Sequence, residues 1–209
     1  KCFHDGYPKE WIDYEYNQQN EVCKSGLSIP HYYESEFQGT IKMDLICGCS
    51  MFEKISSLGK DAVMDDFMTW FKKIHEIKHL KLDHVSKYLG KQIDSASISE
   101  EQKIYTKQCL LEVEKEDVED EVLCHMDYHT LNVMYENDNI RIIDWVNAKN
   151  GKPIWDYART YVIFYEYAAG LKRNYMKRVL ALEGYSEGLF MKAVFVSAIC
   201  RLAEHDTKR

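Results

Sequence analysis

Apolar residues recur at helical spacing over most of this sequence and alternate with polar residues over two shorter stretches. The strongest helical pattern covers residues 61–77, and its apolar stripe consists of Val63, Phe67, Trp70, Phe71, Ile74 and Ile77. Similar patterns predict further helices at residues 83–92, 154–168, 173–185 and 186–205. The chain is therefore expected to be mostly helical.

Two other helices are predicted from mixed signals. In residues 9–24 the apolar positions that suggest a helix are Trp11, Ile12, Tyr16 and Val22. Ser97 and Glu100 have the spacing of a capping box, which predicts a helix from there to Val113. The apolar stripe of that helix consists of Ile104, Cys109 and Leu110.

The alternating stretches predict two β-hairpins. Residues 31–48 have the pattern of two short strands that are joined at Gly39 and end near Ile46. Residues 132–144 contain two strand-like runs around the polar turn Glu-Asn-Asp-Asn. The pattern is therefore α+β: a helix and a hairpin are followed by a helical body into which a second hairpin is inserted.

Composition narrows the class of protein. The 209 residues are 45% hydrophobic, which is enough for a globular core, and the net charge of −7 argues against a nucleic-acid ligand. The sequence shows neither a signal peptide nor an apolar stretch of roughly 20 residues, so we expect a cytoplasmic protein without membrane contact. Seven cysteines without CxxC spacing favour reduced thiols, although Cys47 and Cys49 have the spacing of a redox or metal pair.

A dense polar cluster, His-Met-Asp-Tyr-His-Thr-Leu-Asn, precedes the second hairpin, and Asp144 follows it. The hairpin can bring Asp127, Asn132 and Asp144 together because its two ends are adjacent in space. A carboxylate and a carboxamide oxygen suit a hard cation such as Mg²⁺, and a second carboxylate is left to orient a hydroxyl nucleophile. Phosphoryl transfer uses this combination of groups.

A second interpretation of the cluster is a transition-metal site. Zinc or iron would be bound by His125, Asp127, His129 and Asp144. This interpretation leaves Asn132 unexplained, because a carboxamide is a poor zinc ligand. In the phosphoryl-transfer interpretation His129 makes a hydrogen bond within the loop rather than carrying protons.

The cluster and the later Ile-Asp-Trp resemble the H-x-D-x-H-x-x-N and I-D-W/F motifs of the aminoglycoside phosphotransferase and choline kinase family, a branch of the protein-kinase-like superfamily. The resemblance implies that Asp127 is the catalytic base and that Asn132 and Asp144 bind Mg²⁺. It also implies that His125 holds the catalytic loop. Asp156 lies in a segment similar to the family's G-x-P-x-x-D-x-A, which implies that it braces the loop through hydrogen bonds.

The order of elements upstream is similar to the small lobe of the same family. By this resemblance Lys1 reaches the ATP phosphates and pairs with Glu15, with Glu21 as the competing partner. The hinge that binds adenine corresponds to Met43, Asp44 and Ile46. The family's glycine-rich loop and its strands have no counterpart from Lys1 onward, so an intact enzyme is expected to carry them upstream.

We therefore expect a protein-kinase-like α+β fold, with a partial β-rich small lobe and hinge at residues 1–46 and a helical large lobe at residues 47–209. The expected activity is transfer of the ATP γ-phosphoryl group, with Mg²⁺, to a hydroxyl of an aminoglycoside-like, amino-alcohol or sugar acceptor. The alternative is a kinase-like binding module or pseudokinase without transfer. A protein kinase is disfavoured because Trp145, rather than Phe-Gly, follows Asp144. The oligomeric state is left open.

Three further features have less specific interpretations. Family members usually have Gly at the position of Met126, a difference that a strand-like backbone would tolerate. Trp145 and the Tyr-rich helix at residues 157–167 are expected to pack in the core rather than to form an aromatic box for a cation. Glu204 and Asp206 either face a cationic acceptor or belong to an exposed tail.

Overall fold

The structure, a computed structural model, describes residues 1–115, 121–137 and 139–206. Its helices are α1 (Lys9–Cys23), α2 (Met51–Leu58), α3 (Lys60–His75), α4 (Val85–Ser95), α5 (Glu100–Lys115), α6 (Pro153–Tyr167), α7 (Ala169–Glu183), α8 (Glu187–Asp206) and the 3₁₀ turn η1 (Trp145–Asn147). Its strands are β1 (Tyr32–Tyr33), β2 (Lys42–Met43), β3 (Cys49–Ser50), β4 (Val122–Cys124), β5 (Val133–Glu136), β6 (Asn139–Ile142) and β7 (Lys149–Gly151). The expected α+β class is confirmed.

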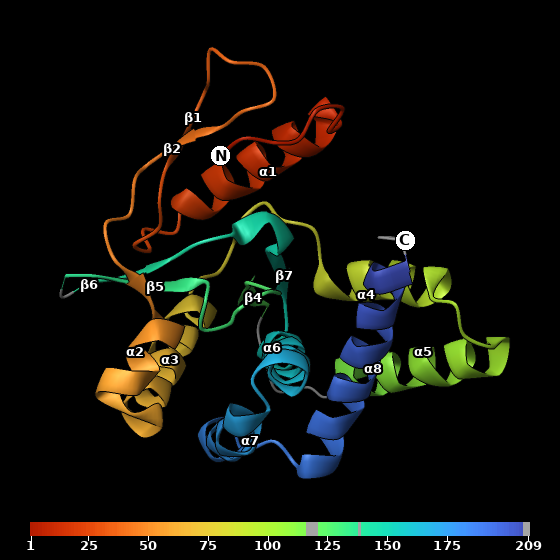
Figure 1. The fold of residues 1–209 in the computed structure, drawn as a ribbon. Coiled ribbons are helices and arrows are strands. Elements are labelled where there is room, and N and C mark those ends of the chain that lie inside the picture. The colour runs from red at the N-terminus through yellow and green to blue at the C-terminus, as the bar shows by residue number, and fades with distance from the viewer. Residues whose placement is uncertain (116–120, 138, 207–209) are drawn as a thin grey trace.

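The helical core is organised around α6, which α8 and α7 flank and which is buried over most of its surface (Figure 1). The stripe predicted for α3 packs into this core, because Val63, Phe67, Phe71 and Ile74 are all buried. Aromatic rings fill the centre, with the Phe67 and Tyr128 centroids 4.4 Å apart. Helices α4 and α5 pack on the other side of α8.

The second hairpin forms as predicted from β5 and β6, and β3 adds a third antiparallel strand. The Asp138 position at its tip lies outside the described residues. Strands β4 and β7 form a separate pair in which Cys124 lies opposite Lys149. These two pairs fix both ends of the polar loop, the name used below for residues 125–132.

The N-terminal part consists of α1 and the β1–β2 pair, with α1 lying across η1 (Figure 1). Tyr32 faces Met43 in the β1–β2 register, as expected for the first hairpin. The buried face of α1 differs from the predicted one: Trp11 is exposed, whereas the buried positions are Glu15, Gln18, Gln19 and Val22. The polar face is buried because Gln18 and Gln19 donate to backbone carbonyls, whereas Val22 packs in the hydrophobic core.

Two details of the predicted elements need correction. Helix α5 is capped by Ser99, whose hydroxyl accepts from the Gln102 amide at 3.2 Å while the Gln102 side chain accepts from the Ser99 amide, so Ser97 is not the cap. Ile104 is 66% exposed, and α5 buries Thr106 on the face that also carries Cys109 and Leu110. The short elements α2, β3, β4 and β7 were not predicted.

All seven cysteines are free thiols. Between Cys47 and Cys49, Gly48 passes so close to β5 that a Cβ there would lie 1.9 Å from the Tyr135 carbonyl oxygen. The Cys-Gly-Cys spacing is thus accounted for by a close backbone crossing.

Within the described ranges, no helix is both long enough and apolar enough to cross a membrane.

Candidate functional site

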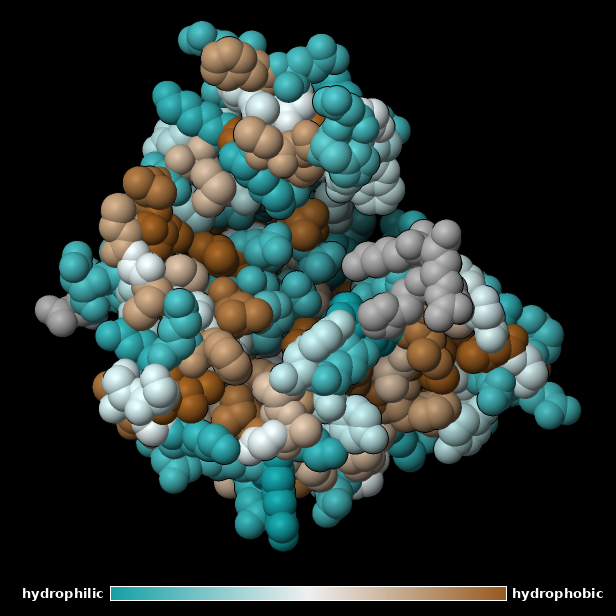
Figure 2. Space-filling model, viewed as in Figure 1, coloured by the Kyte–Doolittle hydropathy of each residue, from teal (hydrophilic) through white to brown (hydrophobic). Residues whose placement is uncertain are grey.

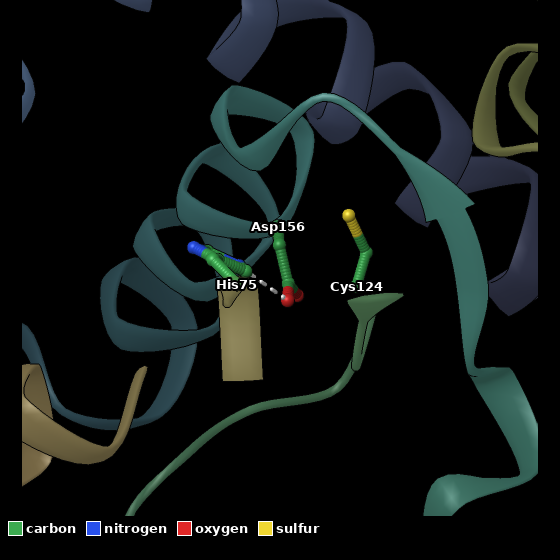
Figure 3. A group of neighbouring side chains, drawn as sticks. All are labelled: His75, Cys124 and Asp156. Carbon is green, nitrogen blue, oxygen red and sulfur yellow. Dashed lines mark hydrogen bonds and ion pairs between the residues drawn. The ribbon is translucent and has the colours of Figure 1, made fainter. Parts of the chain in front are cut away.

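Asp156 supports the polar loop through hydrogen bonds. It lies in the first turn of α6 and is fully buried. One carboxylate oxygen accepts from the His125 amide at 2.7 Å and the other from the Met126 amide at 2.8 Å. His75, at the C-terminal end of α3, adds a third hydrogen bond at 3.1 Å from its Nε2 (Figure 3). Asp156 thus makes hydrogen bonds to the loop of the kind that the family resemblance implied. His75 also bonds Asp156, which the motif did not indicate.

Met126 adopts a left-handed backbone conformation with a φ of 62°. This turn directs two consecutive amides to the same carboxylate, and for a residue other than glycine it costs about 1 kcal/mol. The expectation of a strand-like backbone at Met126 is therefore wrong. A glycine would adopt this φ angle without strain, whereas in this chain the buried Met126 side chain compensates by packing in the core.

His75, Cys124 and Asp156 place a nitrogen, a sulfur and an oxygen within 4.8 Å of one another (Figure 3). Such a set can in principle ligate a metal ion. Both oxygens of Asp156 already accept hydrogen bonds from the polar loop, and the Cys124 thiol lies 3.6 Å from the Gly151 carbonyl oxygen. A metal ion here would have to displace the brace, so we interpret the cluster as a hydrogen-bonded support.

Hydrogen bonds link Asn132 to Asp127 and to Ile143, the residue before Asp144. The Asn132 side-chain amide donates to the Asp127 carbonyl at 2.9 Å, and the Asn132 carbonyl accepts from the Ile143 amide at 3.0 Å. Ile143 directly precedes Asp144, which has a left-handed conformation with φ 66° and ψ 61°. The structure therefore brings the three predicted residues into one region.

The acidic oxygens of this region are largely free of protein partners. Among the described residues, neither the Asp144 carboxylate nor the Asn132 side-chain oxygen accepts a hydrogen bond, and the basic side chain within ion-pair distance of the Asp127 carboxylate is the His129 ring, with Nε2 at 3.8 Å. The negative charge of Asp144 also acts to raise the pKa of His129 and of Tyr32 in β1, which indicates that it lies near both side chains. One amide oxygen and one carboxylate, both uncommitted, are a donor set that suits Mg²⁺.

His129 has its ring fixed within the polar loop. Its Nδ1 accepts from the Leu131 amide at 3.3 Å, so the proton of the neutral ring resides on Nε2, which faces Asp127. Burial lowers the pKa of His129, and this effect exceeds the opposing attraction of Asp127. A neutral ring at physiological pH fits a hydrogen-bonding role in the loop.

His125 is buried and has no nitrogen available for a metal. Its Nε2 bonds the Ile143 carbonyl at 3.0 Å, and its Nδ1 accepts from the Asp127 amide at 3.3 Å. Its ring packs on Trp145, which is fully buried and donates to the Ile142 carbonyl. The transition-metal interpretation of the cluster is therefore not supported, and Trp145 is a core residue as expected.

Lys1 and Glu15 form an ion pair, with 2.5 Å between Nζ and Oε1. The Tyr32 hydroxyl approaches the same carboxylate oxygen at 3.3 Å, and burial together with Glu15 raises the pKa of Tyr32. The competing Glu21 instead pairs with Lys24 and accepts from the Lys81 amide at 2.8 Å. The Lys1 partner in the structure is thus Glu15.

The predicted hinge residues Met43, Asp44 and Ile46 lie at the end of β2 and in the segment that leads to β3. The Asp44 carboxylate is committed to the fold, because it accepts from the His31 amide at 3.0 Å and the Tyr33 hydroxyl at 2.9 Å. Leu45 between Asp44 and Ile46 is 83% exposed, and hydrophobic surface gathers near this linking segment (Figure 2). Polar contacts of this segment with a ligand would therefore come from its backbone rather than from the Asp44 carboxylate.

The family model for a phosphotransferase enzyme family, termed APH, matches residues 67–189. This chain belongs to that family. The matched range contains the polar loop, the hairpin and Asp156, as well as His75. A comparison of this chain with curated protein sequences finds no match.

Solved structures with similar folds include an apo thermostable mutant of aminoglycoside phosphotransferase APH(4)-Ia, with a TM-score of 0.66 and 15% identity over 92% of this chain and 76% of that one. A mutant of the same protein in a ternary complex with AMP-PNP and hygromycin B has a TM-score of 0.62 and 16% identity, over 92% and 77%. A choline/ethanolamine kinase family protein from Mesorhizobium loti has a TM-score of 0.57 and 14% identity, over 92% and 68%. The fold of this chain is protein-kinase-like.

Glu204, on α8, lies in a salt-bridge network. Its carboxylate accepts from Arg159 at 2.7 Å, Arg201 at 3.0 Å and the Tyr88 hydroxyl at 2.8 Å. Both expectations for Glu204 are wrong, because it is neither in an exposed tail nor free for an acceptor. The Asp206 side chain lies outside the described residues.

In the Tyr-rich helix, Tyr157 is buried as expected, whereas Tyr165 and Tyr167 are exposed.

His75 was missed because it lies fifty residues before the motif, at the end of an ordinary amphipathic helix. The available signal was a histidine one turn after Phe71, on the buried stripe of α3. We expect His75→Ala to lower the free energy of unfolding by about 2–4 kcal/mol, because a buried carboxylate loses a hydrogen-bond donor and a cavity forms. Urea unfolding measures this difference.

The matched control is the exposed His4, for which His4→Ala should change the unfolding free energy by less than about 0.5 kcal/mol. Equal, small effects of the two substitutions would show that the two loop amides alone hold Asp156.

Proposed function

We propose that this chain transfers the γ-phosphoryl group of ATP to a hydroxyl of a small molecule. The observation that carries the proposal is the hydrogen-bonded unit formed by Asp127, Asn132 and the Ile143–Asp144 pair. The Asp127 carboxylate is partly exposed, and the Asp144 carboxylate and the Asn132 side-chain oxygen accept no hydrogen bond from the described residues, which supports the proposal. Membership of the phosphotransferase family supports the same reaction.

Asp127 is the proposed base. The acceptor hydroxyl oxygen forms a bond to the γ-phosphorus, the bond from that phosphorus to the β–γ bridging oxygen breaks, and the hydroxyl proton passes to the Asp127 carboxylate. Asp127 suits this role because its side chain is 23% exposed and its carboxylate is held by no strong donor. Its backbone is fixed by His125 and Asn132, so the carboxylate is oriented while it remains accessible.

Asn132 and Asp144 are the residues that would hold Mg²⁺. Their oxygens are of the type that this ion prefers, and the left-handed backbone of Asp144 is stabilised by the buried Trp145 that follows it. When bound, the ion would offset negative charge on the triphosphate.

Lys1 and Glu15 are proposed to position the ATP phosphates. Glu15 is buried and receives both Lys1 and the Tyr32 hydroxyl, so it can hold the lysine in place while Lys1 keeps part of its side chain exposed. The Asp44 carbonyl and the Ile46 amide are proposed to bind adenine, with Met43 behind them. On this proposal residues 1–46 belong to the small lobe and hinge, and residues 47–209 form the large lobe.

The acceptor is proposed to be an aminoglycoside-like molecule, an amino alcohol or a sugar. Hygromycin B and AMP-PNP bound to a protein of similar fold, and a fold neighbour among choline/ethanolamine kinases, support these classes. The cytoplasmic location and the lack of a membrane or nucleic-acid partner stay predictions from the sequence.

The test is an ADP-release assay of the full-length protein with Mg²⁺ and ATP, against a panel of aminoglycosides, choline, methylthioribose and simple sugars. We expect one acceptor class to stimulate ADP release and to gain one phosphate by mass spectrometry. Binding of ATP with no stimulated release by any acceptor class would favour the pseudokinase alternative. Absence of both binding and release would contradict the proposed function.

A further inference from the structure

Lys149, the first residue of β7, is a buried cation without a bound carboxylate. Its side chain donates to the Tyr14 hydroxyl at 3.0 Å, the Ala148 carbonyl at 3.0 Å and the Asn147 carbonyl at 3.3 Å. Lys149 is only 6% exposed, and among the described residues no acidic group lies within ion-pair distance of its Nζ. A buried ammonium that has only neutral acceptors is disfavoured relative to one in water.

The groups that surround Lys149 are neutral hydrogen-bond acceptors and aromatic rings, which offset only part of this cost. Tyr14 of α1 and Tyr88 of α4 face it with ring centroids 5.7 and 5.6 Å from Nζ, and burial raises the pKa of both tyrosines, so their hydroxyls are neutral. The one acid that acts on it, Asp83, is largely exposed. Burial lowers the pKa of Lys149 to about 8. A carboxylate partner therefore does not explain why a lysine is buried at this position.

The hydrogen bonds of Lys149 join two segments that carry site residues. Tyr14 directly precedes Glu15, which pairs with Lys1. One turn later on α1, the Gln18 side chain donates at 2.9 Å to the Ala148 carbonyl, the same oxygen that Lys149 contacts. Ala148 ends the η1 turn, which begins directly after Asp144. Two residues of α1 are thus tied to the segment that follows the proposed metal ligand.

The contact between α1 and the η1 segment is polar, and this affects how firmly the position of α1 is fixed. An apolar interface can slide with little cost, whereas directional hydrogen bonds fix one register of α1 on η1. The buried face of α1 is mainly polar, with Val22 as its one buried apolar residue within the helix. The position of Glu15 relative to Asp144 therefore depends on a few polar bonds.

We propose that Lys149 is a positioning residue, which through Tyr14 fixes α1, and hence Glu15 and Lys1, relative to Asp144. The predicted effect on ATP binding rests on the proposed function. The predicted attachment of α1 by Lys149 does not. Lys149 itself touches neither nucleotide nor acceptor on this proposal. Its effect should appear in nucleotide binding rather than in the chemistry at Asp127.

The test compares Lys149→Met, Tyr14→Phe and the double variant with the wild-type full-length protein. The control is Lys87→Met, which removes an exposed lysine of α4 that pairs weakly with Asp83. The first readout is amide hydrogen exchange. We expect α1 to exchange about tenfold faster in Lys149→Met and a few-fold faster in Tyr14→Phe, with α6 unchanged in both and Lys87→Met equal to the wild type.

The second readout is the kinetics of ADP release. We expect the KM for Mg·ATP to rise about tenfold in Lys149→Met, with kcat lowered less than threefold and the KM of the acceptor unchanged. Adding Tyr14→Phe to Lys149→Met should change little further, because both substitutions remove the same bond.

Two outcomes would overturn the inference. One is unchanged exchange in α1 in both single variants; the other is equal acceleration in α1 and α6, which would assign Lys149 to global stability. If the wild type shows no phosphotransfer, the proposed function fails. The hydrogen-exchange data still show whether Lys149 and Tyr14 hold α1 in place. Tyr14→Phe keeps the test decisive if Lys149→Met does not fold.

Discussion

Asp127→Asn should lower kcat by about 10²–10⁴-fold, the usual contribution of a general base, while the Kd for ATP changes by less than about threefold. A carboxamide keeps the size of the side chain but does not take up the acceptor proton at neutral pH. The backbone contacts of Asp127 with His125 and Asn132 do not involve its carboxylate, so the loop should keep its shape. Stimulated ADP release gives kcat, and calorimetric titration gives the Kd.

A matched control is Asp94→Asn, which alters an exposed aspartate that pairs with Lys107 on the far helices α4 and α5. It should retain wild-type turnover. If Asp127→Asn kept more than a tenth of the wild-type kcat, a base other than Asp127 would have to be sought, and the mechanism above would be wrong.

The parts of the site that are close in sequence could be predicted. His125, Asp127 and Asn132 lie within eight residues, and Asp144 is reached by a single hairpin whose alternation is clear. Because the ends of a hairpin must meet, the pattern alone brings these residues together. The support from Asp156 was implied by the family resemblance rather than by spacing.

Other parts could not be predicted because they depend on long-range packing. The β4–β7 pair joins residues 122–124 to residues 149–151, and three-residue strands leave no readable period. The left-handed conformation of Met126 has no local signal, since that residue type rarely adopts it. The cap of α5 was misassigned because Ser97–Glu100 and Ser99–Gln102 both have the spacing of a capping box.

The N-terminal part shows a different cause of error. Helix α1 was identified from Trp11 and three other apolar residues, although Trp11 is 56% exposed and the buried face carries Glu15 and Gln18. Hydrophobic periodicity indicates the core-facing side only when a helix packs on a core. Here much of the buried face of the helix makes hydrogen bonds and an ion pair, so its buried residues are mainly polar.

Asp144→Asn should weaken the response to Mg²⁺ strongly, with the metal concentration for half-maximal activity rising on the order of 10²-fold and kcat falling by a similar factor. Asparagine tolerates the left-handed backbone at this position, so the substitution isolates the loss of charge from strain. Asp144→Ala adds about 1 kcal/mol of backbone cost, because alanine adopts this conformation less readily. Urea unfolding separates that cost from the effect on the metal.

The decisive comparison is nucleotide affinity with and without Mg²⁺. If Asp144 binds the metal, Asp144→Asn should reduce affinity for Mg·ATP while leaving affinity for metal-free ATP equal or higher, because one negative charge near the triphosphate is removed. Asp127→Asn should not show this metal dependence, since its carboxylate acts on the acceptor hydroxyl. An unchanged Mg²⁺ response in Asp144→Asn would remove Asp144 from the metal site and would leave its uncommitted carboxylate and left-handed backbone without a function.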